Sequence, residues 1–414
     1  MSNTFYITTP IYYVNDKPHI GHAYTTILAD VLARYHRNTE KKTFFLTGLD
    51  EHGQKVQQAA EERGVEPQQH CDEMAPRFTE LWEQLHISHD DFIRTTEERH
   101  KKVVRDILQQ VMDKGDIYEA EYEGLYSVSE ERFITEKEAE SGEFRDIKQL
   151  KEKNYFFKMS KYQQALIDHI KSNPKFIQPD HRKNEILGFL RQPLNDLCIS
   201  RPKSRLNWGI ELPFDSDYVT YVWFDALINY ITAPGFGRDE ESFNKWWPAS
   251  YHLIGKDILT THAVYWPTML MSAGIELPKT IFAHGWWLMG ESKMSKSLGN
   301  VINPMDLIDD YGVDPVRYYL MREMVLGQDS SFTMESFIQR YNSDLANDFG
   351  NLLSRVSTLM KKNYDGKIPE PGDFTEAETV IKSNGESLGE VVKEKIESMR
   401  LNEAIEEIMQ YIRS

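Results

Sequence analysis

Two short segments, far apart in the chain, carry side chains that are suited to binding phosphate groups. The first is His19-Ile20-Gly21-His22, and the second is Lys293-Met294-Ser295-Lys296-Ser297. His19 and His22 are three residues apart at the start of an expected helix, which places both imidazoles near one face of its first turn. Helix N-termini attract anions through free N–H groups and a partial positive charge. The lysines add point charges that suit a phosphate chain.

The two segments together predict a nucleotide site, and the absence of another motif indicates which bond is broken. The Gly-rich P-loop pattern G-x-x-x-x-G-K-S/T does not occur in the sequence. Gly21 has no side chain, so a flat base can lie against the backbone there. We therefore expect nucleotidyl transfer, in which a carboxylate attacks the α-phosphate and pyrophosphate leaves. Such a step depends on positioning and charge stabilisation, without a protein nucleophile.

The elements that must position these segments follow an alternating strand and helix pattern. In chain order we expect a strand over Phe5–Thr9, an irregular loop bracketed by Pro10 and Pro18, a helix from about Gly21 to Arg37, a strand over Lys42–Leu46 and helical periodicity through about Gln54–Leu85. The pattern returns at Tyr218–Phe224, Tyr251–Ile254 and Ile281–Ala283. This alternation predicts a parallel α/β sheet with sites at the carboxyl ends of its strands.

The length of 414 residues exceeds what one hydrophobic core usually serves. We expect a catalytic domain in two halves, residues 1–114 and 213–330, with a domain inserted between them over residues 115–212. Residues 331–414 are expected to form a helical domain. Its last stretch ends without the Gly or Asn that usually terminates a helix, so we expect the domain to be incomplete and the sequence to be truncated.

Composition and charge exclude several classes of protein. The net charge of −17 argues against nonspecific coating of nucleic acid. Lys151–Lys161 and Arg182–Arg205 form either local basic tracks or ordinary solvated faces, and both alternatives stay open. No apolar run approaches the roughly 18 residues that span a bilayer. The N-terminus resembles no targeting signal and cysteine occurs only at positions 71 and 198, so we expect a reducing, cytoplasmic location without a membrane partner.

The chain resembles the class I aminoacyl-tRNA synthetases, whose two hallmark motifs match at His19–His22 and Lys293–Ser297. Within that class it is similar to the methionyl-tRNA synthetase family. The supporting segments are Pro10–Asn15, Gly48–Gly53, Tyr221–Ala226, Ile254–Ile258, His284–Trp286 and Asn351–Arg355. The resemblance covers nearly the whole chain. It implies a Rossmann-like catalytic domain, an inserted connective-peptide domain and an α-helical anticodon-binding domain.

The resemblance also implies a role for individual side chains. The methionine side chain is expected against Ile11, Tyr13, Trp223, Ala226, Tyr230 and His284, and the substrate ammonium group at Asp50. Aromatic rings give a polarizable thioether favourable contacts. The implied ATP-binding residues are His19, Gly21, His22, Gly255, Asp257, Lys293 and Lys296, of which the two histidines and two lysines are catalytic. ATP is a substrate and Mg²⁺ accompanies it.

The inserted segment departs from many members of this family, which carry C-x-x-C pairs that bind zinc. Ser127 and Glu130 stand where the first pair is expected, and neither Cys nor His occurs from Val111 to Ser160. Tetrahedral zinc sites need thiolate or imidazole ligands, so we expect no zinc and no other structural metal. The segment then depends on packing of Tyr122, Tyr126 and Phe133. This variant resembles the zinc-free type shared by some bacteria and by mitochondria.

The implied partners are L-methionine, ATP and tRNA(Met), both elongator and initiator. Asn351 and Arg355 lie four residues apart on one expected helix face, which suits reading of unstacked bases. The family also uses a tryptophan further along, and none follows Trp287 here. We therefore expect anticodon binding weakened by about 1–3 kcal/mol, and methionine activation less affected than tRNA charging. The inserted segment shows no exposed apolar stripe that would argue for contacts between chains, and we expect a monomer in preference to a dimer.

Two alternatives remain open. One is a class I synthetase for another small amino acid. Enzymes for valine and isoleucine need an editing domain, because one methylene gives only about 1–3 kcal/mol of discrimination, and residues 115–212 are too few for it. An enzyme for cysteine should show zinc-binding Cys and His residues. The other alternative is a catalytically silent paralogue that binds tRNA or serves assembly, which the intact histidine and lysine motifs argue against.

Overall fold

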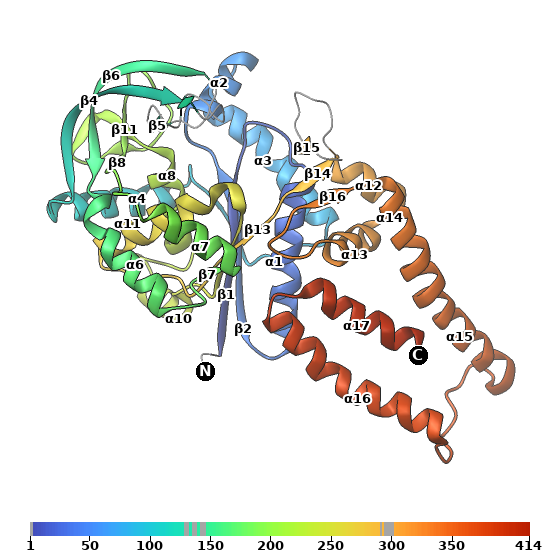
Figure 1. Cartoon of the computed structure of the whole chain (residues 1–414). Helices are drawn as coiled ribbons and strands as arrows, with labels where there is room; N and C mark the ends of the chain where they lie inside the picture. The colour runs from blue at the N-terminus through green and yellow to red at the C-terminus, as the bar shows by residue number, and fades with distance from the viewer. Residues whose placement is uncertain (1–2, 128–131, 135–138, 141–145, 290–291, 294–301) are drawn as a thin grey trace. The chain divides into compact units, whose positions relative to one another are not determined.

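The computed structural model describes residues 3–127, 132–134, 139–140, 146–289, 292–293 and 302–414 (Figure 1). Two compact units make up the chain, and each is described by itself. Unit 1 comprises Met1–Lys17, Ala29–Glu80 and Ser88–Ala283. Unit 2 comprises Pro18–Leu28, Leu81–Ile87 and His284–Ser414. The expected domain limits at residues 114, 212 and 330 stay a prediction.

A six-stranded sheet forms the centre of unit 1. Its strand order is β3-β2-β1-β12-β13-β7. The bounds are β1 (Thr4–Tyr13), β2 (Lys42–Asp50), β3 (Asp91–Arg94), β7 (Ile177–Gln178), β12 (Tyr251–Gly255) and β13 (Ile281–His284). Strand β1 pairs in parallel with β2 on one side (Figure 1) and with β12 on the other. The parallel sheet expected from the sequence is therefore present.

Strand β1 is longer than its sequence predicted, because it continues through Pro10 to Tyr13. The expectation of an irregular loop starting at Pro10 is wrong. Proline cannot donate to a neighbouring strand, but the register with β2 shifts between Thr8 and Ile11, so no donor is needed at this point. The extension brings the last residues of β1 to the carboxyl edge of the sheet.

Helices pack against this sheet and share its hydrophobic core. Those in or entering unit 1 are α1 (Ile20–Asn38), α2 (Gln54–Arg63), α3 (Pro67–Gln84), α4 (Glu98–Asp113), α6 (Gln163–Ser172), α7 (Asp180–Phe189), α8 (Val222–Ala226), α9 (Asn229–Thr232), α10 (Glu240–Trp246) and α11 (Trp266–Ala273). Shorter helical elements are the 3-10 helices η1 (Met159–Tyr162) and η2 (Lys256–Ile258) and the π-helix η3 (Thr261–Tyr265). Helix α4 buries Val104, Ile107 and Leu108 on one face, and these residues belong to the same hydrophobic core as Tyr6 and Ile254.

The inserted segment is built from antiparallel strands. One sheet has the order β5-β4-β6-β8, with β4 (Ile117–Ser127), β5 (Arg132–Ile134), β6 (Ile147–Phe157) and β8 (Leu197–Cys198). A second has the order β10-β11-β9, with β9 (Ser200–Pro202), β10 (Glu211–Leu212) and β11 (Asp215–Thr220). Residues 218–224 were expected in the parallel α/β pattern, and this is wrong. Their strand part pairs antiparallel with β9, and α8 follows directly.

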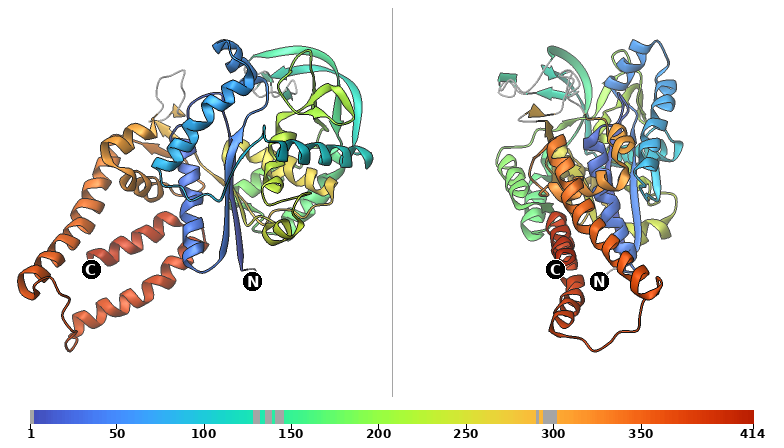
Figure 2. Two further views of the ribbon diagram at one scale, coloured as in Figure 1. Left: turned by 180° about the vertical axis from the view of Figure 1, so that it is seen from behind. Right: turned by 90° about the vertical axis from the view of Figure 1, so that its right-hand side faces the viewer.

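Unit 2 is mainly helical and contains a small sheet. The sheet order is β15-β14-β16, with β14 (Trp287–Met289), β15 (Ser292–Lys293) and β16 (Ser330–Phe332). The helices are α12 (Pro304–Tyr311), α13 (Val313–Glu323), α14 (Met334–Arg340), the π-helix η5 (Tyr341–Gly350), α15 (Asn351–Tyr364), α16 (Glu376–Glu397) and α17 (Leu401–Arg413). Helices α16 and α17 lie side by side and run antiparallel, as Figure 2 shows.

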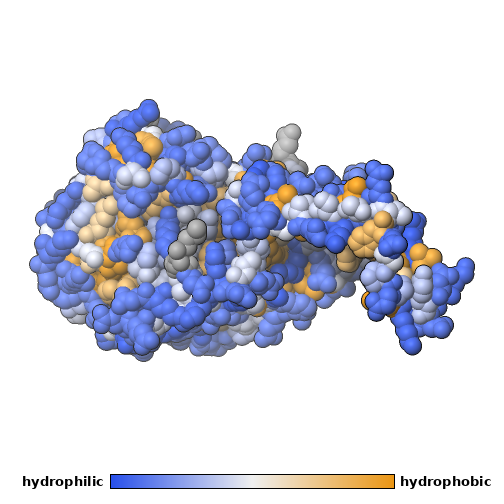
Figure 3. All heavy atoms as spheres, turned by 90° about the horizontal axis from the view of Figure 1, so that it is seen from below, coloured by the Kyte–Doolittle hydropathy of each residue, from blue (hydrophilic) through white to orange (hydrophobic). Residues whose placement is uncertain are grey.

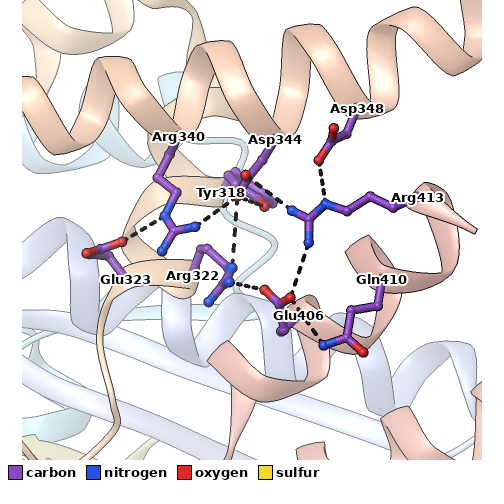
Figure 4. Close-up of polar contacts among 9 residues, drawn as sticks. All are labelled: Tyr318, Arg322, Glu323, Arg340, Asp344, Asp348, Glu406, Gln410 and Arg413. Carbon is purple, nitrogen blue, oxygen red and sulfur yellow. Dashed lines mark hydrogen bonds and ion pairs between the residues drawn. The ribbon is translucent and has the colours of Figure 1, made fainter.

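A network of charged groups joins three helical elements of unit 2 around Asp344, which is 2% exposed (Figure 4). Its carboxylate accepts a hydrogen bond of 2.7 Å from the Tyr318 hydroxyl of α13. It also lies 3.4 Å from Arg340 of α14 and 3.5 Å from Arg413 of α17. Arg413 bonds Asp348 at 2.6 Å. Helix η5, which carries Asp344 and leads into α15, is thus bonded to α13, α14 and α17.

Large apolar side chains are exposed along α15, among them Leu353 and Leu359. Figure 3 shows hydrophobic surface, coloured orange, near its right-hand edge, on the side where Figure 1 labels α15 and α16. The expectation of a monomer stays a prediction. Within the described ranges, no helix combines the length and apolar character needed to cross a membrane.

The Asp344 network predicts a large loss of stability when its central carboxylate is removed. We expect Asp344→Ala to lower the free energy of unfolding by about 3 kcal/mol, because the Tyr318 hydroxyl and the partly exposed Arg340 and Arg413 lose this buried acceptor. Urea unfolding followed by circular dichroism measures this change. Asp348→Ala is the matched control, with an expected loss of about 1 kcal/mol or less, since its side chain is more exposed. Equal losses for the two variants would contradict the central role of Asp344.

Candidate active site

The carboxyl ends of β1 and β2 bring three of the expected methionine-site residues together. Tyr13 is the register partner of Asp50, and Ile11 is the partner of Gly48. Asp50 is 3% exposed, while Ile11 and Tyr13 are partly buried and pack against the core. A carboxylate at this strand end, beside an aromatic ring, can fix a cationic group in an otherwise apolar setting.

Helices α8 and α9 supply the aromatic residues expected for the same site. Trp223 and Ala226 lie on α8, and Tyr230 lies on α9. The rings of Trp223 and Tyr230 both contact His262, with centroids 6.2 Å and 5.7 Å from that imidazole. The charge of Asp50 also acts on Tyr230, whose pKa is raised, chiefly by burial. Asp50, Trp223 and Tyr230 therefore belong to one locality of unit 1.

Two buried imidazoles that the sequence did not single out support this aromatic wall. His262 bonds the backbone oxygen of Ile258 through Nδ1 at 3.0 Å, so its Nε2 accepts the hydroxyl of Tyr230 at 2.8 Å. His252 lies against the Tyr230 ring at 4.2 Å, and its Nε2 accepts the indole N–H of Trp266. Both rings are therefore neutral. Burial lowers the pKa of His262 to about 4 and that of His252 well below its usual value.

The loop that follows Asp50 is held by buried polar contacts. The carboxylate of Glu51 bonds Arg94 at 2.7 Å, and burial raises the pKa of Glu51. His52 Nδ1 lies 2.6 Å from Asp225, a buried residue of α8. The second oxygen of Asp225 lies 2.7 Å from His100 Nε2. Burial by itself raises the pKa of Asp225, but its two imidazole partners outweigh that effect and hold it at about 2.

The expected adenosine-binding residues follow strand β12. Gly255 is the last residue of β12, and Asp257 lies in the turn η2 that comes directly after it. Asp257 is exposed to solvent. Because β1 and β12 are adjacent parallel strands, Gly255 lies at the same edge of the sheet as Tyr13. An exposed carboxylate after such a strand is suited to bonding ribose hydroxyls.

In unit 2, the first histidine motif has a compact geometry at the start of α1. The rings of His19 and His22 stack with centroids 3.8 Å apart. His19 Nδ1 accepts the backbone N–H of Gly21 at 3.0 Å, and His22 Nδ1 accepts that of His19 at 3.2 Å. Each neutral ring therefore carries its hydrogen on Nε2, where it can donate to an anion. A Cβ atom at position 21 would lie 2.9 Å from the His19 ring, so any side chain there would force this ring to move.

His284, also in unit 2, is buried and bonded to α1. Its Nε2 lies 2.7 Å from the hydroxyl oxygen of Thr25, and its Nδ1 donates to the backbone oxygen of Gly285. The ring of Tyr24 meets it edge-on at 5.0 Å. A Cβ atom on Gly285 would come within 1.9 Å of the Gln328 backbone oxygen, which explains why glycine follows this histidine.

The second motif is described only in part. Lys293 lies in β15, where its backbone pairs with Leu288 of β14. Lys296 lies outside the described residues. Asn351 and Arg355 are both exposed on α15, four residues apart as expected.

The inserted segment was expected to be held by packing instead of a metal. Ser127 and Tyr126 are buried at the end of β4, whereas Glu130 and the side chains of Tyr122 and Phe133 lie outside the described residues. The guanidinium groups of Arg201 and Arg205 lie over the Tyr126 ring, at 5.4 Å and 4.6 Å. In the part of the chain that the structure describes, no three metal-ligating side chains gather.

The two basic segments of the insertion are largely paired with carboxylates. Lys153 lies 2.5 Å from Glu119, and Lys161 lies 2.6 Å from the buried Asp116. Arg205 lies 3.0 Å from Glu152. These pairs favour an ordinary charged surface over a basic track for nucleic acid.

The neutral His262 predicts that acid destabilises the fold. Its pKa is about 6.5 when unfolded and about 4 when folded, so between these values the unfolded chain binds the extra proton and the folded chain does not. Stability is therefore full above pH 6.5 and falls as the pH drops, by about 2 kcal/mol for this group between pH 6.5 and 5. Urea unfolding at several pH values measures the slope.

A matched pair of variants isolates this contribution. His262→Asn should flatten the slope by close to one proton, whereas His181→Ala, which removes an exposed imidazole of α7, should leave it unchanged. If His262→Asn keeps the slope of the unaltered chain, the neutral buried imidazole is not its source.

Comparisons with known proteins agree with this geometry. The sequence profile of the family described as tRNA synthetases class I (M) matches residues 5–144 and 141–357. The methionine–tRNA ligase of Thermotoga maritima is 47% identical over 416 residues, covering 99% of this chain and 66% of that protein. The corresponding ligase of Fusobacterium nucleatum is 50% identical over 419 residues, covering 100% and 66%. The chain thus spans about two thirds of the length of these curated relatives.

A solved structure resembles the whole chain. The methionyl-tRNA synthetase of Mycobacterium tuberculosis in complex with methionyl-adenylate matches with a TM-score of 0.95 and 42% sequence identity, covering 100% of this chain and 82% of that chain. The Rossmann-like fold and the family resemblance expected from the sequence are both confirmed. The chain belongs to the class I tRNA synthetases, in the family of the methionine–tRNA ligases.

Proposed function

We propose that this chain activates L-methionine with ATP and then charges tRNA(Met). In the first step a carboxylate oxygen of methionine attacks the α-phosphorus of ATP. The bond between that phosphorus and the bridging oxygen breaks, which gives methionyl-adenylate and pyrophosphate. In the second step a hydroxyl of the 3′-terminal adenosine of tRNA attacks the methionyl carbonyl, and AMP leaves.

The observation that supports methionine most strongly is the locality formed by Asp50, Trp223 and Tyr230. Asp50 supplies a buried negative charge for the ammonium group. The aromatic wall is backed by the neutral His252 and His262, so it offers a thioether no competing charge. Ile11, Tyr13 and Ala226 complete the apolar surface, and His284 is proposed as a further methionine-binding residue.

The ATP side of the reaction is assigned to the two motifs. The Nε2–H groups of His19 and His22 are donors suited to charge that develops on the phosphates. Lys293 and Lys296 are proposed to stabilise the leaving pyrophosphate, while Gly255 and Asp257 take the adenosine. Mg²⁺ enters with ATP as a complex with its phosphates.

Fewer observations support the proposed contacts with tRNA. The exposed Asn351 and Arg355 are proposed to contact the anticodon of both elongator and initiator tRNA(Met). We also propose action as a monomer in the cytoplasm, without zinc.

Amino-acid-dependent exchange between ATP and pyrophosphate tests the proposal. We expect exchange driven by methionine, with kcat lowered about 100-fold or more in His22→Ala because a donor to the transition state is lost. Asp50→Asn should raise the methionine KM about tenfold or more, since the ammonium group loses its buried counter-charge.

The control is His181→Ala, an exposed histidine of α7 that should exchange like the unaltered chain. Faster exchange with another amino acid would support a synthetase of different specificity. Absence of exchange with every amino acid would support a silent paralogue.

A further inference from the structure

A buried carboxylate is held between two imidazoles on α8, the helix that carries two residues of the proposed methionine site. Asp225 lies between Trp223 and Ala226 in sequence and is fully buried. One of its oxygens accepts from His52 Nδ1 at 2.6 Å, and the other accepts from His100 Nε2 at 2.7 Å. The proposed reaction assigns no role to these three side chains, which we call the Asp225 clamp.

The clamp joins three elements of unit 1. His52 belongs to the loop after β2, His100 to α4 and Asp225 to α8. His52 is 3% exposed and His100 is fully buried. An ionised carboxylate is costly to remove from water unless its hydrogen bonds are made, so each imidazole is needed where it lies. Both nitrogens approach the carboxylate at distances typical of charge-assisted hydrogen bonds.

The clamp residues are close in sequence to residues assigned to the substrate, so the clamp can influence where those residues lie. His52 comes two residues after Asp50, which is assigned to the ammonium group. Asp225 comes two residues after Trp223 and one before Ala226, which are assigned to the side chain. The clamp therefore connects the backbone that carries the charged end of the site to the backbone that carries its apolar wall.

Other contacts hold the same loop in different directions. The Glu51 carboxylate bonds Arg94 of β3, and the Gly53 N–H donates to the Trp208 backbone oxygen at 3.2 Å. The Trp208 indole also donates to the Glu51 backbone oxygen. These contacts fix the loop to β3 and to the inserted segment, whereas the clamp fixes it to α8.

We propose that His52, Asp225 and His100 are positioning residues that set the separation of Asp50 from Trp223 and Ala226, and thereby the affinity for methionine. The inference rests on the proposed function and deepens it. A site misplaced by about 1 Å loses on the order of 10- to 100-fold in the affected parameter. The loss is expected in the methionine KM, while the ATP KM stays within about twofold.

Amide substitutions at the two histidines separate positioning from fold stability. The side-chain nitrogen of Asn can take the place of imidazole Nδ1, and that of Gln can take the place of Nε2. His52 bonds Asp225 through Nδ1 and His100 does so through Nε2. We therefore expect His52→Asn and His100→Gln to keep a methionine KM near that of the unaltered chain. His52→Gln, His100→Asn and Asp225→Asn should raise it about tenfold or more.

Asp116→Asn serves as a control in the same unit. Asp116 is also a buried carboxylate, bonded to Lys161 at 2.6 Å and to Ser272 at 2.8 Å, and the proposed site does not include it. It should lower the melting temperature and leave the methionine KM unchanged.

The measurement is ATP–pyrophosphate exchange, with melting temperatures recorded for every variant. The inference is overturned if Asn and Gln have the same effect on the methionine KM at each of the two histidines. It is also overturned if the methionine KM of Asp225→Asn is no higher than that of Asp116→Asn. Either result leaves the proposed function intact. If Asp225→Asn fails to fold, the four histidine variants decide. An unaltered chain without methionine-dependent exchange would overturn both proposals.

Discussion

The parallel pairing of β1 with β2 on one side and β12 on the other is the constraint on which the site depends. The chain leaves β1 toward β2 and β3 and later returns on the opposite side as β12. Connections that leave adjacent parallel strands in opposite directions open a crevice at the carboxyl edge. Tyr13, Asp50 and Gly255 are all terminal residues of these strands, so the topology alone brings substrate-binding candidates to one edge.

Behind this edge, unit 1 uses buried polar groups in two opposite ways. His252 and His262 stay neutral, because each accepts a hydrogen bond from a tryptophan or tyrosine and loses the solvation that a charge needs. Asp225 stays ionised, because two imidazoles donate to it. The first arrangement gives an apolar wall without charge, and the second gives a rigid link to a charged loop. A substrate with a thioether and an ammonium group needs both.

Local sequence could predict the parts of the site that depend on residue type and spacing. The His19–His22 motif and the strand ends follow from short-range patterns. Such patterns could not group His52 and His100 with Asp225, since these histidines lie 173 and 125 residues before it in the sequence. The only available signal was the place of Asp225 between two expected pocket residues. Pro10 misled the strand assignment, because a register shift removes the need for its missing donor.

The central claim is that methionine lies between the charged end of β2 and the aromatic wall of α8 and α9. A crystal structure of this chain with a non-hydrolysable methionyl-adenylate analogue tests it most directly. We expect the ammonium group within hydrogen-bond distance of Asp50 and the thioether against Trp223 and Tyr230. An analogue whose ammonium group lies away from Asp50, or whose side chain does not contact these rings, would contradict it.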